Sequence, residues 1–255
     1  MTTATSLSRA QRASYHEKGH LVVARIVPET FLDGMQRLLE ELVEQRISQW
    51  RREGLLTVPI SSSDFGTRYL QAWLAAGRPQ DDGTVGDRLF TAAARNAYLS
   101  QDWLLALAAE CLGAERVSVL KSCFVRAKFP QDASTTLPWH QDAQCLKPIS
   151  GTDFVTVWIP LWTGPEARSC IEVSPVRTGH QLYEAVWSTV NSYTCMTEAD
   201  SGRLSRVEVI TLRRGDLLVM NPYLPHRSVD NVGADVRWSV DLRFSPGPRD
   251  QPGRR

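Results

Sequence analysis

The sequence predicts an antiparallel β-sandwich or barrel with a layer of helices packed against it. Apolar residues recur three and four apart through most of the first 113 residues, which is the spacing of amphipathic helices. From residue 116 the chain changes to short β-rich runs separated by Pro, Gly and Asp. Strands that follow one another without intervening helices favour antiparallel pairing over a parallel α/β sheet.

The helix-rich region is predicted to span residues 14–113, after a small, polar start, Met1 to Arg12, that we expect to fray. A short strand over 21–27 precedes a helix that begins near Pro28 or Thr30 and passes Ile47. Further helices are expected over 63–76, from about Asp87 through Ala94, and from a cap at Ser100 with Asp102 to Gly113.

The β-rich core is predicted to span residues 116–245, with strands over 117–125, 154–161, 170–173, 207–212, 217–220 and 236–244. Residues 177–204 form an insert too long for a hairpin loop and too aromatic for a linker. We expect a helical or irregular lid there, over one end of the barrel. The Pro-rich tail, 246–255, is expected to be disordered.

Length and composition indicate one cytoplasmic domain of 255 residues. The formal net charge of +1 predicts neither a nucleic-acid nor a membrane partner. The five cysteines are widely spaced and lack a Cys-x-x-Cys pair, which is typical of reduced thiols. The N-terminus lacks the apolar core of a signal peptide, and no apolar run reaches membrane-spanning length.

The stretch Pro138-Trp139-His140-Gln141-Asp142 carries the main chemical signal. If it is extended, residues two apart share a face, so His140 and Asp142 converge on one point. A His-x-Asp tripeptide arises easily by chance, but His226 offers a third ligand at the start of another extended run, 227–230. Two histidines and one carboxylate leave one side of a metal open, as in non-haem Fe(II) oxygenases.

The last predicted strand alternates strictly between apolar and polar residues from Val236 to Phe244. Its polar face either meets solvent, which is the ordinary case, or takes part in chemistry. Arg237 lies on that face, eleven residues after His226, and Arg243 shares it.

These residues resemble the phytanoyl-CoA dioxygenase family of Fe(II)- and 2-oxoglutarate-dependent oxygenases. In that family a His-x-Asp pair and a distal His hold iron, and an Arg about eleven residues later binds the far carboxylate of 2-oxoglutarate. His140, Asp142, His226 and Arg237 match these four positions. Flanking sequence over 15–23, 155–161, 214–216 and 226–231 is similar as well, so the likeness covers most of the chain.

The resemblance implies a double-stranded β-helix of jelly-roll type, with N-terminal helices packed on one sheet. It implies Fe(II), 2-oxoglutarate as cosubstrate and O₂, with Trp158 packing on the cosubstrate and the Ser228 hydroxyl touching it. Related halogenases carry Ala or Gly where this chain has Asp142, which argues for hydroxylation. The sequence departs from the family at the turn over 169–177 and throughout 177–204, the region that shapes the substrate pocket.

We therefore expect hydroxylation of an unactivated C–H bond in a small metabolite of a biosynthetic pathway, with release of succinate and CO₂. The same iron centre could instead serve desaturation, epimerisation or cyclisation. A non-catalytic cupin-like binding protein is the alternative of another class, although it has no need of a carboxylate-binding Arg.

Six further side chains are assigned from the sequence. Trp162 and Trp187 are pocket candidates. Arg243 is the one rival of Arg237 for the cosubstrate, and a more distant location or a structural pairing with Asp241 or Asp216 is favoured for it. The remaining histidines, His16, His20 and His180, lack a partner at ligand spacing and are assigned to the surface or the core.

Overall fold

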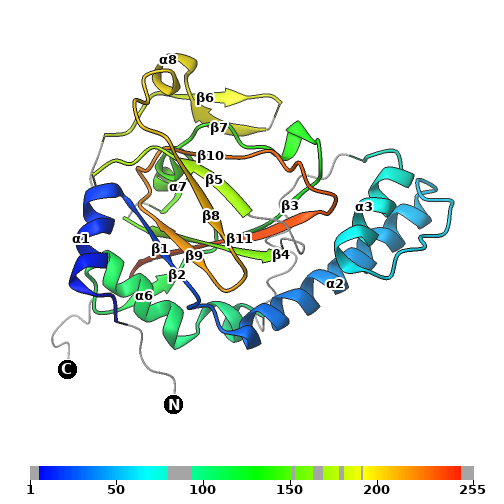
Figure 1. Ribbon diagram of the computed structural model, residues 1–255, viewed down its shortest axis with the longest axis horizontal. Helices are drawn as coiled ribbons and strands as arrows, with labels where there is room; N and C mark the ends of the chain where they lie inside the picture. The colour runs from blue at the N-terminus through cyan, green and yellow to red at the C-terminus, as the bar shows by residue number, and fades with distance from the viewer. Residues whose placement is uncertain are drawn as a thin grey trace.

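The protein folds as two facing antiparallel sheets with helices along the outer side of the larger one (Figure 1). The computed structural model describes residues 6–79, 94–150, 153–162, 169–177, 181–190 and 192–247. The large sheet has the order β1 (His20–Val23), β9 (Leu217–Met220), β4 (Val155–Trp162), β11 (Arg237–Pro246), β2 (Val117–Val119), and β3 (Phe124–Lys128) also pairs with β11. The small sheet has the order β10 (His226–Ser228), β5 (Ser169–Val173), β8 (Glu208–Leu212). The predicted antiparallel β fold with a helical layer is confirmed.

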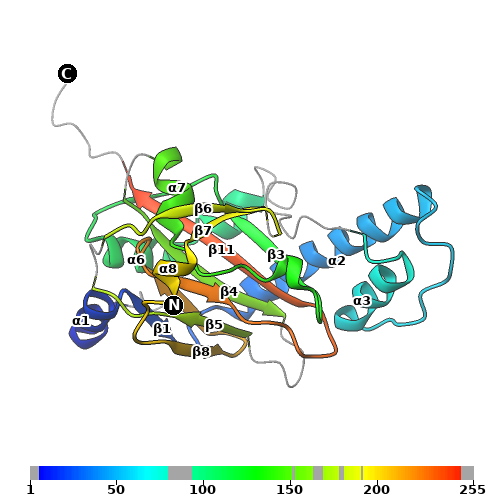
Figure 2. The same cartoon turned by 90° about the horizontal axis from the view of Figure 1, so that it is seen from above.

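The longer helices pack on the large sheet because each has one apolar face. They are α1 (Arg9–Lys18), α2 (Glu29–Arg52), α3 (Phe65–Ala75) and α6 (Asp102–Leu112), and a π-helix covers Arg95–Leu99. Helices α2 and α6 contact β4, and α6 also contacts β11. Figures 1 and 2 show that α2 and α3 project together beyond one end of the sheets.

Strand β11 separates the helical core from the interior of the barrel. Its even-numbered side chains, Trp238, Val240, Leu242 and Phe244, are fully buried in the core shared with the helices. The odd-numbered ones, Arg237, Ser239, Asp241 and Arg243, line a cavity between the two sheets. The predicted alternation is thus confirmed, and the polar face points into the barrel rather than into solvent.

Three predicted element boundaries are wrong. Helix α1 already begins at Arg9, because Ser8 and Gln11 form a capping box that satisfies its first backbone amides. The strand predicted over 117–125 is two strands, β2 and β3, which pair with different halves of β11. The N-cap of α6 is Gln101 rather than Ser100.

Where the structure describes it, the insert over 177–204 forms a hairpin followed by one helical turn, so the expected helical or irregular form is wrong, whereas its role as a lid stays a prediction. Strand β6 (Ala185–Ser188) pairs with β7 (Tyr193–Met196), and α8 (Glu198–Ser201) follows. In Figure 1 these elements lie on the opposite side of the sheets from α2 and α6.

Two predicted segments lie mainly outside the described residues. Of the helix expected from about Asp87, the structure describes Ala94, which precedes the π-helix. Of the tail predicted over 246–255, it describes Pro246, which is the last residue of β11, and Gly247. Within the described residues, no helix combines the length and the apolar character needed to cross a membrane.

Candidate metal centre

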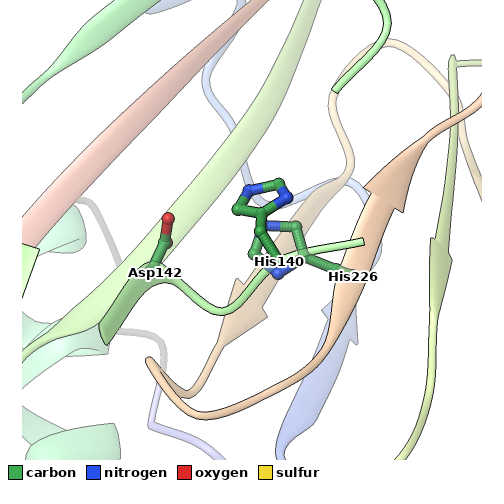
Figure 3. A group of neighbouring side chains, drawn as sticks. All are labelled: His140, Asp142 and His226. Carbon is green, nitrogen blue, oxygen red and sulfur yellow. The ribbon is translucent and has the colours of Figure 1, made fainter. Parts of the chain in front are cut away.

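The backbone brings the two candidate histidines side by side. His140 and His226 form an isolated antiparallel bridge, in which each N–H donates to the other's carbonyl at 3.0 and 2.9 Å. Their ring centroids lie 4.1 Å apart, and both side chains are buried. Figure 3 shows the two imidazoles next to each other, with Asp142 beside them.

Asp142 lies beside the two histidines, but it does not belong to an extended segment as the sequence predicted. Helix α7 (Asp142–Ser150) begins at this residue. The Gln141 amide donates to the Gln144 side chain at 2.9 Å, which satisfies a backbone donor just before the helix. The carboxylate therefore projects from a helix N-terminus, and the three ligand atoms lie within 4.8 Å of one another.

Hydrogen bonds fix the tautomer of both histidines. Nδ1 of His140 lies 2.8 Å from the carbonyl of Pro138, and Nδ1 of His226 lies 3.0 Å from that of Leu224. A carbonyl only accepts, so each Nδ1 carries the proton and each Nε2 keeps its lone pair for a metal. Burial and the neighbouring His226 lower the pKa of His140 well below its usual value, so His140 is neutral.

The carboxylate of Asp142 is held at both oxygens. Oδ1 accepts a hydrogen bond from Arg243 Nη2 at 3.1 Å, and Oδ2 accepts one from the Thr156 hydroxyl at 2.5 Å. Burial alone would raise the pKa of Asp142, but the charge of Arg243 outweighs it and, with the hydrogen bond from Thr156, holds that pKa well below the ordinary value. The residues therefore present two imidazole Nε2 atoms and one ionised carboxylate, which is the donor set that suits Fe(II).

Arg243 is buried beside this carboxylate, with 2% of its side chain exposed. It also donates from Nη1 to the carbonyl of Ser122 and lies 3.8 Å from Asp241. Its main partner is thus the metal ligand Asp142, which the sequence argument did not name. Asp216 instead accepts hydrogen bonds from the backbone of Arg213 and Arg25.

The cavity beside the triad encloses about 640 Å³, its mouth included. Trp158, Ser228 and Arg237 line it, as do Arg126 and Lys128 of β3. Lys128 lies opposite Arg237 in the β3–β11 register, and both donate to the carbonyl of Val229.

Sequence reasoning missed Arg126, Lys128 and Thr156 as residues of this site. The alternation of polar residues at 124–128 could have indicated the first two, because Phe124, Arg126 and Lys128 share a strand face. Of the two tryptophans predicted near the pocket, Trp187 is 64% exposed and does not line it. The side chain of Trp162 and the whole of His180 lie outside the described residues.

The insert is tied to the metal-binding segment by glutamine side chains. Gln141 is fully buried, and its Nε2 donates to the carbonyls of Gln181 and Tyr223 at 3.1 and 2.6 Å. Its Oε1 accepts from the amide of Tyr183 at 2.8 Å. Gln141 lies between the ligands His140 and Asp142 in the sequence. Its side chain therefore links the metal-binding segment to residues 181 and 183, which lead into the hairpin.

We predict that Gln141→Ala loosens the hairpin. Loss of two or more hydrogen bonds should speed amide exchange at Tyr183 and across 181–190 by roughly tenfold or more. Hydrogen exchange measured by mass spectrometry checks this, with Gln36→Ala on the exposed surface of α2 as the control. Unchanged protection in Gln141→Ala would contradict the coupling.

Three solved structures resemble this one over nearly its whole length. EvdO2 from Micromonospora carbonacea var. aurantiaca, complexed with 2-oxoglutarate, has a TM-score of 0.67 at 14% identity, covering 99% of this chain and 96% of its own. EctD from S. alaskensis, with 2-oxoglutarate and 5-hydroxyectoine, has a TM-score of 0.63 at 15% identity, covering 96% and 78%. The non-heme α-ketoglutarate-dependent carbocyclase SnoK from nogalamycin biosynthesis has a TM-score of 0.59 at 18% identity, covering 96% and 86%.

At these identities the likeness establishes the double-stranded β-helix fold. A search among curated proteins gave no match. The sequence profile described as "Phytanoyl-CoA dioxygenase (PhyH)" matches residues 15–239, a range that contains all three ligands of the triad. With His140, Asp142 and His226 gathered as a metal-binding triad, the chain belongs to the phytanoyl-CoA dioxygenase family of Fe(II)- and 2-oxoglutarate-dependent oxygenases.

Proposed function

We propose that this oxygenase hydroxylates an unactivated C–H bond of a small organic metabolite in a biosynthetic pathway. The observation that carries the proposal is the ionised carboxylate of Asp142, held as third ligand beside a cavity. A third protein ligand leaves room at the metal for 2-oxoglutarate and O₂ and none for a halide in addition. Hydroxyectoine in the EctD structure supports hydroxylation, and SnoK, a carbocyclase from nogalamycin biosynthesis, supports only the biosynthetic setting.

We further propose that Arg237 binds the far carboxylate of 2-oxoglutarate, with Ser228 donating from its hydroxyl and Trp158 packing against the carbon chain. A buried carboxylate needs a hydrogen-bonded cation, and Arg237 has a planar guanidinium group at the cavity wall. Lys128, opposite Arg237, adds a second cation at the same end. Arg243 holds the metal ligand Asp142, so Arg237, whose Nη2 donates to the Val229 carbonyl, is the better candidate.

His140, Asp142 and His226 would hold Fe(II), which together with 2-oxoglutarate and O₂ would supply the oxidising power for hydrogen removal from the substrate, with release of succinate and CO₂. The protein's own part is positional. Thr156 and Arg243 orient the carboxylate of Asp142, and the carbonyls of Pro138 and Leu224 keep both Nε2 atoms available. Tyr193 of the hairpin packs edge-on against His140, and we expect this contact to limit the access of water to that ligand.

The test is a metabolite screen in which succinate formation from 2-oxoglutarate is followed with Fe(II) in air. A substrate should stimulate succinate release, and its product should gain the mass of one oxygen atom. A product that loses two hydrogens indicates desaturation or cyclisation, and one of unchanged mass indicates epimerisation. Either of these results would replace hydroxylation by the alternative chemistry of the same centre.

Lys128 leads to a prediction about pH. Burial and the nearby Arg237 lower the pKa of Lys128 to about 7. A bound carboxylate favours the charged lysine, so above that pH binding must take up a proton, and affinity for 2-oxoglutarate should fall as pH rises. Titration of the Mn(II)-loaded enzyme with 2-oxoglutarate at several pH values measures this. Lys128→Met should bind more weakly and lose most of the pH dependence, and an equally steep dependence in that variant would contradict the assignment.

A further inference from the structure

The cavity lining carries an excess of positive charge. Among the described residues that line it, the permanent cations are Arg126, Arg237 and Arg243, and the acids are Asp142 and Asp241. Lys128 also lines it but is only partly charged near neutral pH, because burial lowers its pKa to about 7. The two histidine ligands serve as neutral imidazoles.

Binding of Fe(II) and 2-oxoglutarate does not remove this excess of positive charge. Fe(II) brings two positive charges and 2-oxoglutarate brings two negative ones, so together they leave the balance of the side chains unchanged. Three arginines against two carboxylates leave one positive charge, before Lys128 is counted. One more anion bound in the cavity during the reaction would offset this positive charge.

Arg126 has the free donors to receive that anion. Its Nε donates to Asp241 Oδ2 at 2.7 Å, and its side chain is 20% exposed. Within the described part of the chain, neither Nη atom makes a hydrogen bond, whereas both Nη atoms of Arg243 do. The outer edge of Arg126 therefore has the parallel N–H pair that binds a carboxylate in bidentate fashion.

Aromatic contacts place this edge close to the metal ligands. The guanidinium of Arg126 lies over the rings of Phe124 and Tyr193, at 5.4 and 5.9 Å from their centroids. Tyr193 in turn packs edge-on against His140 at 5.0 Å. Arg126 is thus held rigidly by Asp241 and two rings, one of which touches a metal ligand.

We propose that the free edge of Arg126 binds a carboxylate, and that the substrate of this oxygenase is a monocarboxylic acid anchored there. This inference rests on the proposed function. The two outer N–H groups of Arg126 match the two oxygens of one carboxylate. The same chemistry could also come from the metal-end carboxylate of 2-oxoglutarate, so the experiment must separate the two sources.

The test uses propionate as the probe and propionamide as its neutral counterpart. Relaxation of the probe's methyl protons by Mn(II) is measured by NMR in the enzyme loaded with Mn(II) and saturating 2-oxoglutarate. Propionate should be relaxed strongly and propionamide should not. Arg126→Gln should weaken propionate binding by roughly tenfold or more, the loss typical of a charged hydrogen bond.

Two further variants keep the result interpretable. Arg227→Gln removes an arginine on β10 that pairs with Glu172 and does not line the cavity, so propionate binding should be unchanged. Arg126→Gln combined with Asp241→Asn removes the anchor together with its partner carboxylate, in case the single variant folds poorly. The double variant should lose propionate binding as well.

The outcomes separate this inference from the proposed function. If propionate competes with 2-oxoglutarate and Arg126→Gln weakens 2-oxoglutarate itself, the cosubstrate is the ligand and the substrate assignment is overturned. If propionamide is relaxed as strongly as propionate, or if both Arg126 variants bind propionate as well as the wild type does, Arg126 does not recognise a carboxylate. In either case the proposed binding of metal and cosubstrate is unaffected. Failure of the wild-type enzyme to bind Mn(II) and 2-oxoglutarate would overturn the proposed function as well.

Discussion

His226→Ala is expected to lose nearly all affinity for Fe(II). Removing a partner that only orients a ligand typically costs 10- to 100-fold in metal affinity, and removing a ligand should cost more, roughly 100-fold at least. His226 is buried, and its Nδ1 is already committed to the carbonyl of Leu224, so its Nε2 has no other role in the site. Anaerobic titration of the apo-enzyme with Fe(II) or Mn(II) measures the loss.

Two variants calibrate that loss. His20→Ala removes another buried histidine, one that contacts Lys18 and Glu208 outside the cavity, and should leave metal affinity unchanged. Thr156→Val removes one hydrogen bond to Asp142, so its metal affinity should lie between that of His20→Ala and that of His226→Ala. Wild-type affinity in a folded His226→Ala variant would show that the triad does not hold the metal.

Arg237→Ala is expected to raise the apparent 2-oxoglutarate requirement by at least about 30-fold, with metal affinity little changed. Truncating one partner of a buried charge pair costs about 2 to 5 kcal/mol, which is roughly 30-fold to several thousandfold in affinity. Arg237→Lys should recover only part of the loss, because an ammonium group cannot form the two parallel hydrogen bonds that a guanidinium forms with a carboxylate. Succinate formation as a function of 2-oxoglutarate concentration measures both variants.

Arg243→Ala is the matched comparison on the same strand face. It removes the hydrogen bond to Asp142, so its expected effect is on metal affinity rather than on the 2-oxoglutarate requirement. Should Arg243→Ala instead need far more 2-oxoglutarate while Arg237→Ala behaves as wild type, the cosubstrate contact belongs six residues further along β11.

The helices α2 and α3 and most strands of the two sheets could be predicted because their patterns are local. Apolar residues three and four apart mark the buried face of α2, and alternation marks β11, whatever the rest of the chain does. The three metal ligands could also be predicted from the sequence, because an open Fe(II) site requires two histidines and one carboxylate. Element ends were less predictable, as the capping box at Ser8 illustrates, because they depend on single hydrogen bonds.

By itself the sequence determined an antiparallel β fold with a helical layer, the identity of the three metal ligands and the polar face of β11, while the jelly-roll class came from the resemblance to the family. Only the tertiary structure decided that Asp142 begins a helix, that Arg243 contacts its carboxylate, and that the insert forms a hairpin tied to Gln141. It also brought Arg126 and Lys128 into the cavity. These contacts join residues about 40 to more than 100 positions apart, and they depend on strand register and on the turn at Gln141, which no local pattern encodes.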